Sequence, residues 1–266
     1  MGMGSVTEFL LAHPTATQIF LFGMILTTAW VAEKLYSGQT ARDKLRHTGI
    51  NAVFMSGVLP VQLVMTTVSL AAAHWATSHQ FGLRFLLPHP DNPWIRLGVM
   101  FLALDFLDYA YHYLAHQTRI WKLHLVHHTD QSVDVSTTFR EHPGETFVRL
   151  VFFSLAVLAC GASLEVLVLR QTVQSVANIL QHTTFRLPPG PARIVGWLFV
   201  TPNLHHTHHH CRLPGTNCNY GDVFSIWDRL LGTFVEIPCE ETVFGLDTHM
   251  DAGADSRILH LLGFRR

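Results

Sequence analysis

The stretch DFLDYAYHYLAH, residues 105–116, combines an apolar helical pattern with two histidines and two aspartates. His112 and His116 are four residues apart, so a helix would place both imidazoles on one face, about 5–6 Å apart at Cβ. Asp105 and Asp108 precede His112 on the same face. A carboxylate in an apolar span is costly and usually functional. We predict that both aspartates are catalytic-site residues that accept the ring N–H of a metal-binding histidine; a buried polar pair in a helix bundle is the alternative.

The composition of the whole chain favours a membrane protein. Of the 266 residues, 48% are hydrophobic and 14% are charged, against about 25% charged in a typical soluble domain. The formal net charge of −1 gives no indication of nucleic-acid binding. The four cysteines form no CxxC pair, so neither a disulfide framework nor a thiolate zinc site is predicted. Histidine is unusually frequent, with 19 residues.

Long uncharged stretches predict the transmembrane helices. Residues 9–32 and 51–73 contain no Asp, Glu, Lys or Arg, and each could cross a hydrocarbon core, which takes about 20 helical residues. A third apolar stretch runs from residue 94 to about residue 116. The apolar stretch 150–164 stops at Gly161-Ala162-Ser163, and residues 165–181 then return, so the two stretches predict a helical hairpin that spans the membrane fully or in part.

We therefore predict an all-α fold, an integral membrane helical bundle of about four spanning or hairpin helices with a cytoplasmic histidine-rich helical cap. Residues 1–266 would form a single membrane domain. Residues 1–116 would hold transmembrane helices one to three, and residues 117–266 the cytoplasmic metal-site cap with a membrane hairpin at about 146–182. The alternative is a soluble protein with buried helices.

The basic residues of the loops predict the orientation. In chain order they are Lys34, Arg42, Lys44 and Arg46 after the first span, Arg84 and Arg96 between the second and third, and Arg119, Lys122, Arg140 and Arg149 after the third. Because cytoplasmic loops carry the excess of Lys and Arg, the first and last of these sets should be cytoplasmic.

Two further motifs share the spacing HxxHH, one in WKLHLVHHTD at 121–130 and one in TPNLHHTHHH at 201–210. Their histidines are His124, His127, His128, His205, His208 and His209. One such motif is weak support, because histidines also occur in cores and on surfaces. An HxxxH motif followed by two HxxHH motifs on one side of a membrane strongly indicates a metal site. His206 and His210 fall outside the spacing and are predicted to flank the ligands.

The predicted return helix of the hairpin carries a polar stripe formed by Gln171, Gln174, Asn178 and His182. Such a stripe should face a site or the bundle interior, so His182 is predicted as a ligand and Asn178 as a catalytic-site residue. His142 is either a ligand or a residue that contacts one. The scattered histidines are predicted at interfaces or surfaces: His13, His47, His74, His79, His89, His249 and His260.

The number of candidate ligands implies two metal ions, because nine neutral imidazoles exceed what one ion can bind. Imidazole suits zinc, copper, iron and nickel alike. The absence of cysteine ligands argues against a structural zinc site. The ligands alone do not separate iron from zinc.

The motifs resemble those of the fatty acid hydroxylase / sterol desaturase superfamily. The resemblance covers roughly half the chain, from about Asp105 to Phe234, and includes FREHPGE at 139–145 and NYGDVFSIWDRLLGTF at 219–234. It implies two non-haem irons that activate O2, held by His112, His116, His124, His127, His128, His182, His205, His208 and His209. Two positions depart from the pattern: Tyr113 stands where many members have Arg, and Asn178 stands where some have His.

The resemblance also implies an activity. It suggests an O2-dependent di-iron monooxygenase that hydroxylates a C–H bond of a membrane lipid, with a fatty acyl chain, a sterol-like molecule or a lipid head group as substrate. Zinc could occupy the site as purified. Electrons would come from a separate ferredoxin or cytochrome b5 type of donor. Desaturation, or oxidative cleavage of a C–O or C–N bond, is the alternative on the same site. A metal-binding membrane transporter or sensor is the alternative outside enzymes.

The predicted orientation can be tested with reporter fusions. Fusions after Ser37 and at the C-terminus should report the cytoplasm, and a fusion after Gln80 should report the opposite side, because the basic loops are retained inside. A cytoplasmic signal after Gln80 would contradict this topology.

Overall fold

The structure, a computed structural model, describes residues 14–86, 92–251 and 253–263. In these residues the regular elements are helical, and extended backbone pairs only at the isolated bridges Phe199–Phe224 and His210–Phe244. The α-helices are α2 (Pro14–Tyr36), α3 (Ala41–Ser78), α4 (Leu83–Leu86), α5 (Pro93–Gln117), α6 (Trp121–His128), α7 (Pro143–Cys160), α8 (Leu164–Gln181), α9 (Pro189–Val195), α10 (Pro202–His208), α11 (Ile226–Leu231) and α12 (Ile258–Leu261). The 3-10 turns are η1 (Val135–Phe139), η2 (Gly215–Asn217), η3 (Asp247–His249) and η4 (Ala254–Ser256).

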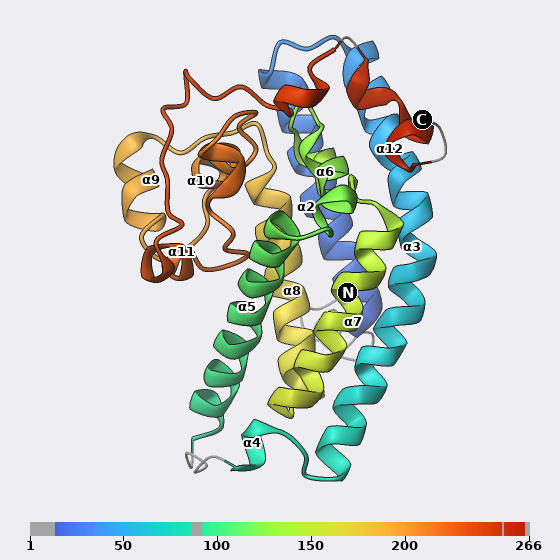
Figure 1. The fold of residues 1–266 in the computed structure, drawn as a ribbon, viewed down its shortest axis with the longest axis vertical. Helices are drawn as coiled ribbons and strands as arrows, with labels where there is room; N and C mark the ends of the chain where they lie inside the picture. The colour runs from blue at the N-terminus through green and yellow to red at the C-terminus, as the bar shows by residue number, and fades with distance from the viewer. Residues whose placement is uncertain (1–13, 87–91, 252, 264–266) are drawn as a thin grey trace, which may run out of the picture.

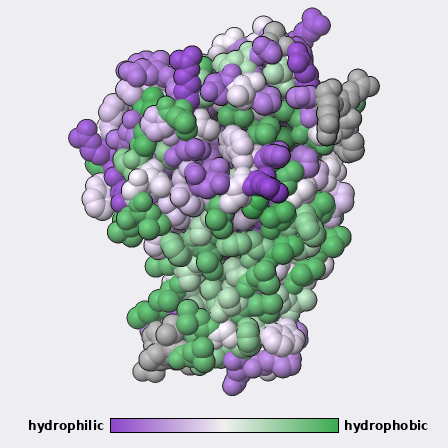
Figure 2. All heavy atoms as spheres, viewed as in Figure 1, coloured by the Kyte–Doolittle hydropathy of each residue, from purple (hydrophilic) through white to green (hydrophobic). Residues whose placement is uncertain are grey.

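The long helices form one bundle, and the short ones gather in a cap at one end of it (Figure 1). Helices α3, α5, α7 and α8 run side by side, and α2 packs against α8. Figure 2 shows hydrophobic residues covering the bundle end and hydrophilic residues predominating on the cap. Three segments are long and apolar enough to cross a membrane: Ile19–Tyr36, Ala41–Leu86 and Pro143–Cys160. The prediction of an all-α membrane protein is confirmed.

The second long helix begins earlier than the apolar pattern predicted. Thr40 caps α3, since its hydroxyl oxygen accepts a hydrogen bond from the Asp43 amide at 3.1 Å. An N-cap of this kind satisfies an amide that has no partner inside the helix. The basic residues Arg42, Lys44 and Arg46, expected in a loop, therefore lie in the first turns of α3. The first apolar stretch was predicted from residue 9, and residues 9–13 lie outside the described residues.

Small side chains allow the bundle helices to approach closely. Ala73, Ala156 and Ala162 are buried in the core shared by α3, α5, α7 and α8, as is typical where helices pack in a membrane. The predicted hairpin turn is confirmed at Gly161, which ends α7 at φ +68°. A Cβ at this position would lie 2.6 Å from the Phe81 carbonyl oxygen, so the turn requires glycine.

A buried ion network joins the first two long helices to the cap. Lys44 Nζ lies 2.5 Å from Glu33 Oε2 and 2.7 Å from Asp134 Oδ2, and all three side chains are buried. Glu33 Oε1 also accepts hydrogen bonds from the amides of Val135 at 3.1 Å and Thr184 at 2.7 Å. Helix α2 thereby holds the two segments that follow His128 and His182.

His47 belongs to the same network and is largely buried, so its predicted place at an interface or surface is wrong. Its ring nitrogens lie 2.8 Å from Asp130 Oδ1 and 3.0 Å from Asp134 Oδ2. The buried Arg140 joins the network through Asn51, because its guanidinium donates to Asn51 Oδ1 at 3.3 Å and Asn51 Nδ2 lies 3.4 Å from His47 Nε2. The sequence pattern missed this role because His47 lies far from these carboxylates along the chain.

We predict that Glu33→Ala destabilises the protein by about 3–5 kcal/mol, because it leaves the Lys44 ammonium buried without one of its two partners. The measurement is thermal unfolding of the detergent-purified protein. Arg42→Ala, which removes an exposed charge from the same region, is the control and should leave the unfolding temperature nearly unchanged. Equal unfolding temperatures for both variants would contradict the stabilising role of the network.

Candidate metal centre

Nine histidines converge in two neighbouring groups within the cap end of the structure. The five-histidine group consists of His112, His116, His124, His128 and His208, and the four-histidine group consists of His127, His182, His205 and His209. Within each group the candidate ligand atoms lie within 4.8 Å of one another. The rings of His128 and His209 stack with centroids 4.7 Å apart, so the two groups adjoin. The nine are the residues that the spacing and the family resemblance predicted.

Each HxxHH motif divides its histidines between the two groups. On α6, His124 and His128 are one turn apart and join the five-histidine group, whereas His127 joins the other group. At α10 the assignment is reversed: His205 and His209 join the four-histidine group and His208 joins the five-histidine group. The two motifs therefore contribute to both groups, and neither group is built from one motif alone.

Backbone and side-chain acceptors orient the rings through Nδ1. His112 Nδ1 donates to the Tyr220 carbonyl at 3.0 Å, and His124 Nδ1 donates to Glu145 Oε1 at 2.6 Å. In the other group, His127 Nδ1 donates to the Arg140 carbonyl at 3.0 Å, and His182 Nδ1 to the Asn178 carbonyl at 2.8 Å. Because a neutral imidazole carries one N–H proton, these bonds leave the Nε2 atom of each of the four rings unprotonated, with a free lone pair.

The Nε2 lone pairs then face one another at short range. His182 Nε2 lies 3.1 Å from His127 Nε2, and His112 Nε2 lies 3.2 Å from His124 Nε2. Since neither nitrogen of such a pair has a proton to donate, no hydrogen bond can form between them. A shared cation removes this repulsion, so the geometry fits a metal ion in each group.

Burial keeps the cap histidines available as neutral ligands. It lowers the pKa of His182 to about 4 and that of His208 to about 3, since an imidazolium would lose its hydration. Burial, together with the neighbouring histidines, also lowers the pKa of His127 and His205 well below the usual value. Metal binding requires the neutral form, so these rings need lose no proton at neutral pH.

Two side chains outside the histidine motifs also accept hydrogen bonds from ring N–H groups. Glu145, in the first turn of α7, orients His124, and Asn217 Oδ1 lies 3.2 Å from His116 Nδ1. The motif FREHPGE predicted no role for Glu145, the second of its two glutamates. A carboxylate within a histidine-containing motif was the one available signal for Glu145; no spacing rule connected Asn217 to His116.

The two aspartates of α5 have other partners than those predicted. Asp105 accepts hydrogen bonds from the Val223 amide at 3.2 Å and from Trp227 Nε1 at 2.7 Å. Asp108 forms an ion pair with Arg170 of α8. Neither aspartate therefore forms the predicted hydrogen bond to a ligand histidine among the described residues. The sequence pattern placed both carboxylates on the correct helix. It could not show that Asp105 would bind the segment 223–227 and that Asp108 would pair with α8.

The remaining candidates take distinct places. The backbone carbonyl of Asn178 accepts a hydrogen bond from His182 Nδ1. The side-chain oxygen of Asn178 is buried without a hydrogen-bond partner among the described residues. His142 caps α7 by accepting from the Gly144 amide at 2.9 Å. His206 Nδ1 accepts a hydrogen bond from Arg186 Nε at 2.9 Å, and His210 Nδ1 accepts one from the Val243 amide at 3.1 Å.

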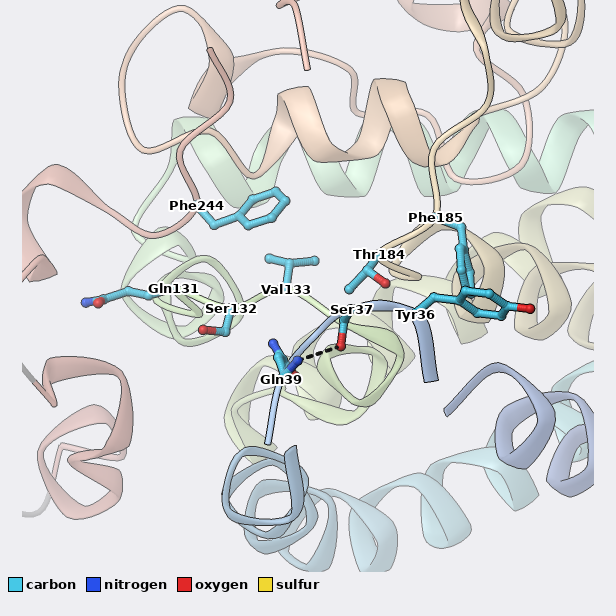
Figure 3. A pocket seen from close by; sticks show the side chains of 9 residues that line it. All are labelled: Tyr36, Ser37, Gln39, Gln131, Ser132, Val133, Thr184, Phe185 and Phe244. Atoms are coloured by element: carbon cyan, nitrogen blue, oxygen red, sulfur yellow. Dashed lines mark hydrogen bonds between the residues drawn. The ribbon is translucent and has the colours of Figure 1, made fainter. Parts of the chain in front are cut away.

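A cavity of about 510 Å³ lies next to the segments that follow α6 and His182 (Figure 3). Its lining residues are Tyr36, Ser37, Gln39, Gln131, Ser132, Val133, Thr184, Phe185 and Phe244. None of them is charged or belongs to either histidine group. The cavity therefore adds no histidine or carboxylate to the candidate metal centre.

The sequence pattern of the fatty acid hydroxylase family matches residues 97–233, which contain all nine histidines. The chain belongs to the fatty acid hydroxylase family. The match begins within α5 and ends after α11, so it covers the metal centre and the helices that hold it.

Curated relatives match part of the chain. The chain is 34% identical over 135 residues to the ornithine lipid hydroxylase of Rhizobium tropici, which covers 50% of this chain and 40% of that protein. It is 31% identical over 164 residues to human alkylglycerol monooxygenase, which covers 60% of this chain and 34% of that protein. It is also 31% identical over 206 residues to the alkylglycerol monooxygenase of Danio rerio, which covers 76% of this chain and 43% of that protein. Each match thus spans less than half of the relative. No solved structure matches the chain.

We predict that Glu145→Gln weakens metal affinity about 10–100-fold, because the charged acceptor that orients and polarises His124 is lost. Metal content after dialysis against a graded chelator gives the measurement. His124→Ala should lose at least as much metal. His260→Ala, an exposed histidine outside both groups, should lose none. If Glu145→Gln retained as much metal as His260→Ala, the role of Glu145 in orienting His124 would be contradicted.

Proposed function

We propose that the protein is a non-haem di-iron lipid hydroxylase, an O2-dependent oxidoreductase that hydroxylates a C–H bond of a membrane lipid. The observation that carries the proposal is the pair of buried groups in which imidazole lone pairs face one another. Membership of the fatty acid hydroxylase family supports the reaction class. The names of the relatives, an ornithine lipid hydroxylase and alkylglycerol monooxygenases, support a lipid substrate.

The nine histidines would hold two iron ions, one in each group. Imidazole also binds zinc, so zinc could occupy the site in purified protein. Two irons supply the activation of O2 and the oxidation of an unreactive C–H bond when bound. The chain supplies neutral ring nitrogens, holds their orientation through Nδ1 and excludes water through burial.

The aspartates of α5 act as positioning residues in this proposal. Asp105 holds the segment from Val223 to Trp227, and Asp108 holds Arg170 of α8. That segment continues directly from Tyr220, whose carbonyl orients His112. Both carboxylates thereby hold α5, α8 and the cap in register around the five-histidine group.

Asn178 has a separate role in the proposal. It lies one helical turn before His182, and its buried side-chain oxygen has no partner among the described residues. A buried acceptor without a partner is costly. We place this oxygen at the four-histidine group, where it would accept a hydrogen bond from a bound water or from a polar group of the substrate.

The substrate would reach the centre from the bilayer. The histidines of α5 lie at the end of a helix that is apolar over most of its length, so a fatty acyl chain, a sterol-like molecule or a lipid head group could approach sideways. The protein would be a multi-pass membrane protein with residues 1–266 as one domain and its active site on the cytoplasmic face. A separate ferredoxin or cytochrome b5 type of protein would supply electrons.

Two other functions are consistent with the same centre. Desaturation, or cleavage of a C–O or C–N bond, needs the same metals and differs in where the substrate C–H bond lies. Metal transport or sensing would need no lipid oxidation at all. The product of the reaction separates these possibilities.

The deciding experiment compares lipids made by the wild type and by a His127→Ala/His128→Ala double variant. Each is expressed with a ferredoxin or cytochrome b5 reductase system, with and without 18O-labelled O2, and total lipids are analysed by mass spectrometry. We expect a lipid with one added, labelled oxygen in the wild type alone, because the double variant removes one ligand from each metal group.

His260→Ala is the control and should make the product at the wild-type level. An unlabelled product that lacks two hydrogens would indicate desaturation, and a shortened fragment would indicate cleavage. Identical lipids from the wild type and the double variant in several lipid backgrounds would contradict the enzymatic proposal.

A further inference from the structure

The cap carries an exposed apolar surface away from the metal centre. We call it the α9–α11 face, and it consists of Ile194, Val195, Trp197, Leu198, Phe199, Leu230 and Leu231. Ile194 is 77% exposed, Trp197 62% and Leu230 68%. In Figure 2 hydrophobic residues gather at the lower left edge of the cap, where Figure 1 places α9 and α11. A contiguous apolar surface of this kind usually marks an interaction site.

The two segments of this face are fastened to each other on their inner side. The Gly196 carbonyl accepts hydrogen bonds from Ser225 Oγ at 2.8 Å and from Arg229 Nη2 at 2.9 Å. The Ser225 amide donates to the Leu198 carbonyl at 2.9 Å. Because the backbone groups are satisfied inward, the apolar side chains form one fixed outward surface.

This face continues directly into the bundle. Phe224, which bridges to Phe199, packs edge-on against Phe101 of α5 with ring centroids 5.9 Å apart. Trp227 of α11 packs against Phe106 of α5 at 5.1 Å. Phe106 is itself exposed on the bundle. The α9–α11 face therefore extends the hydrophobic surface of the bundle sideways along the foot of the cap.

The charges of the face match a membrane boundary. The Arg229 guanidinium lies over the rings of Trp197 and Phe234, at 5.3 and 3.7 Å from their centroids. Arg193 of α9 is exposed beside Ile194. Tryptophan is enriched at membrane–water interfaces, and the exposed Arg193 can keep its charged end in water while its stem lies along apolar surface.

We propose that the α9–α11 face inserts into the boundary between head groups and acyl chains of the bilayer that the bundle crosses. The occupant is membrane lipid, because the face is continuous with the apolar surface of α5 and combines apolar residues, tryptophan and arginine as interfacial segments do. The cap would thus rest on the lipid beside the metal centre. This proposal does not depend on the reaction that the centre catalyses.

The test measures depth in the bilayer with nitroxide spin labels on full-length protein in phosphatidylcholine/phosphatidylglycerol nanodiscs. Labels are attached at Ile194→Cys and Leu230→Cys in a Cys239→Ser background, because the other three cysteines are buried. Leu63→Cys, exposed within a candidate span, is the lipid reference. Glu241→Cys, at an exposed charged position, is the aqueous reference.

We expect the labels at Ile194→Cys and Leu230→Cys to collide with O2 less often than the label at Leu63→Cys and more often than the label at Glu241→Cys, and to collide with a water-soluble nickel chelate less often than the label at Glu241→Cys. Collision with the chelate as frequent as at Glu241→Cys would overturn the proposal. Labels that neither reagent reaches would also overturn it, because a protein partner or a second copy of the chain would then cover the face. Metal content equal to that of the unlabelled protein shows that each variant is folded.

Discussion

The metal centre depends on one constraint: ring nitrogens that carry lone pairs are held face to face. His127 and His182 each donate Nδ1–H to a backbone carbonyl, which leaves their Nε2 atoms 3.1 Å apart with no proton between them. Such an arrangement is unfavourable for neutral rings and becomes favourable around a cation. A bound cation would offset the repulsion that the fold imposes, so metal binding would stabilise this arrangement of the cap.

The partners that impose this arrangement come from outside the histidine motifs. Arg140 orients His127 through its carbonyl, and Glu145 orients His124 from the first turn of α7. Arg140 is in turn held by the Val126 carbonyl of α6. Helix α2 takes part from a distance, since Glu33 binds the amides of Val135 and Thr184. The bundle thus holds the centre from the segments on either side of its ligands.

Helix α5 connects the apolar bundle to the metal centre. Its lower part packs into the core with Met100 and Leu104, and its last turns carry His112 and His116. The α9–α11 face continues the apolar surface of the same helix along the cap. Under the proposed function, a lipid that leaves the bilayer at this level would move along α5 to approach the histidines.

The sequence by itself determined the helical membrane class, the hairpin turn at Gly161 and the nine histidines, because apolar length, glycine at a turn and ligand spacing are local properties of the chain. It could not assign histidines to groups. His127 and His128 are adjacent in sequence and still belong to different groups, since successive residues on a helix point in different directions and the partner rings come from α5, from α10 and from the ends of α8 and α10. Nor could it place the carboxylates: Asp105 meets Trp227 rather than a histidine, and Glu145, to which the sequence pattern assigned no role, meets His124. These partners come from segments that lie far apart in the chain. Tertiary packing therefore decides which hydrogen-bond donor lies nearest to each carboxylate, and the spacing of residues along the chain does not.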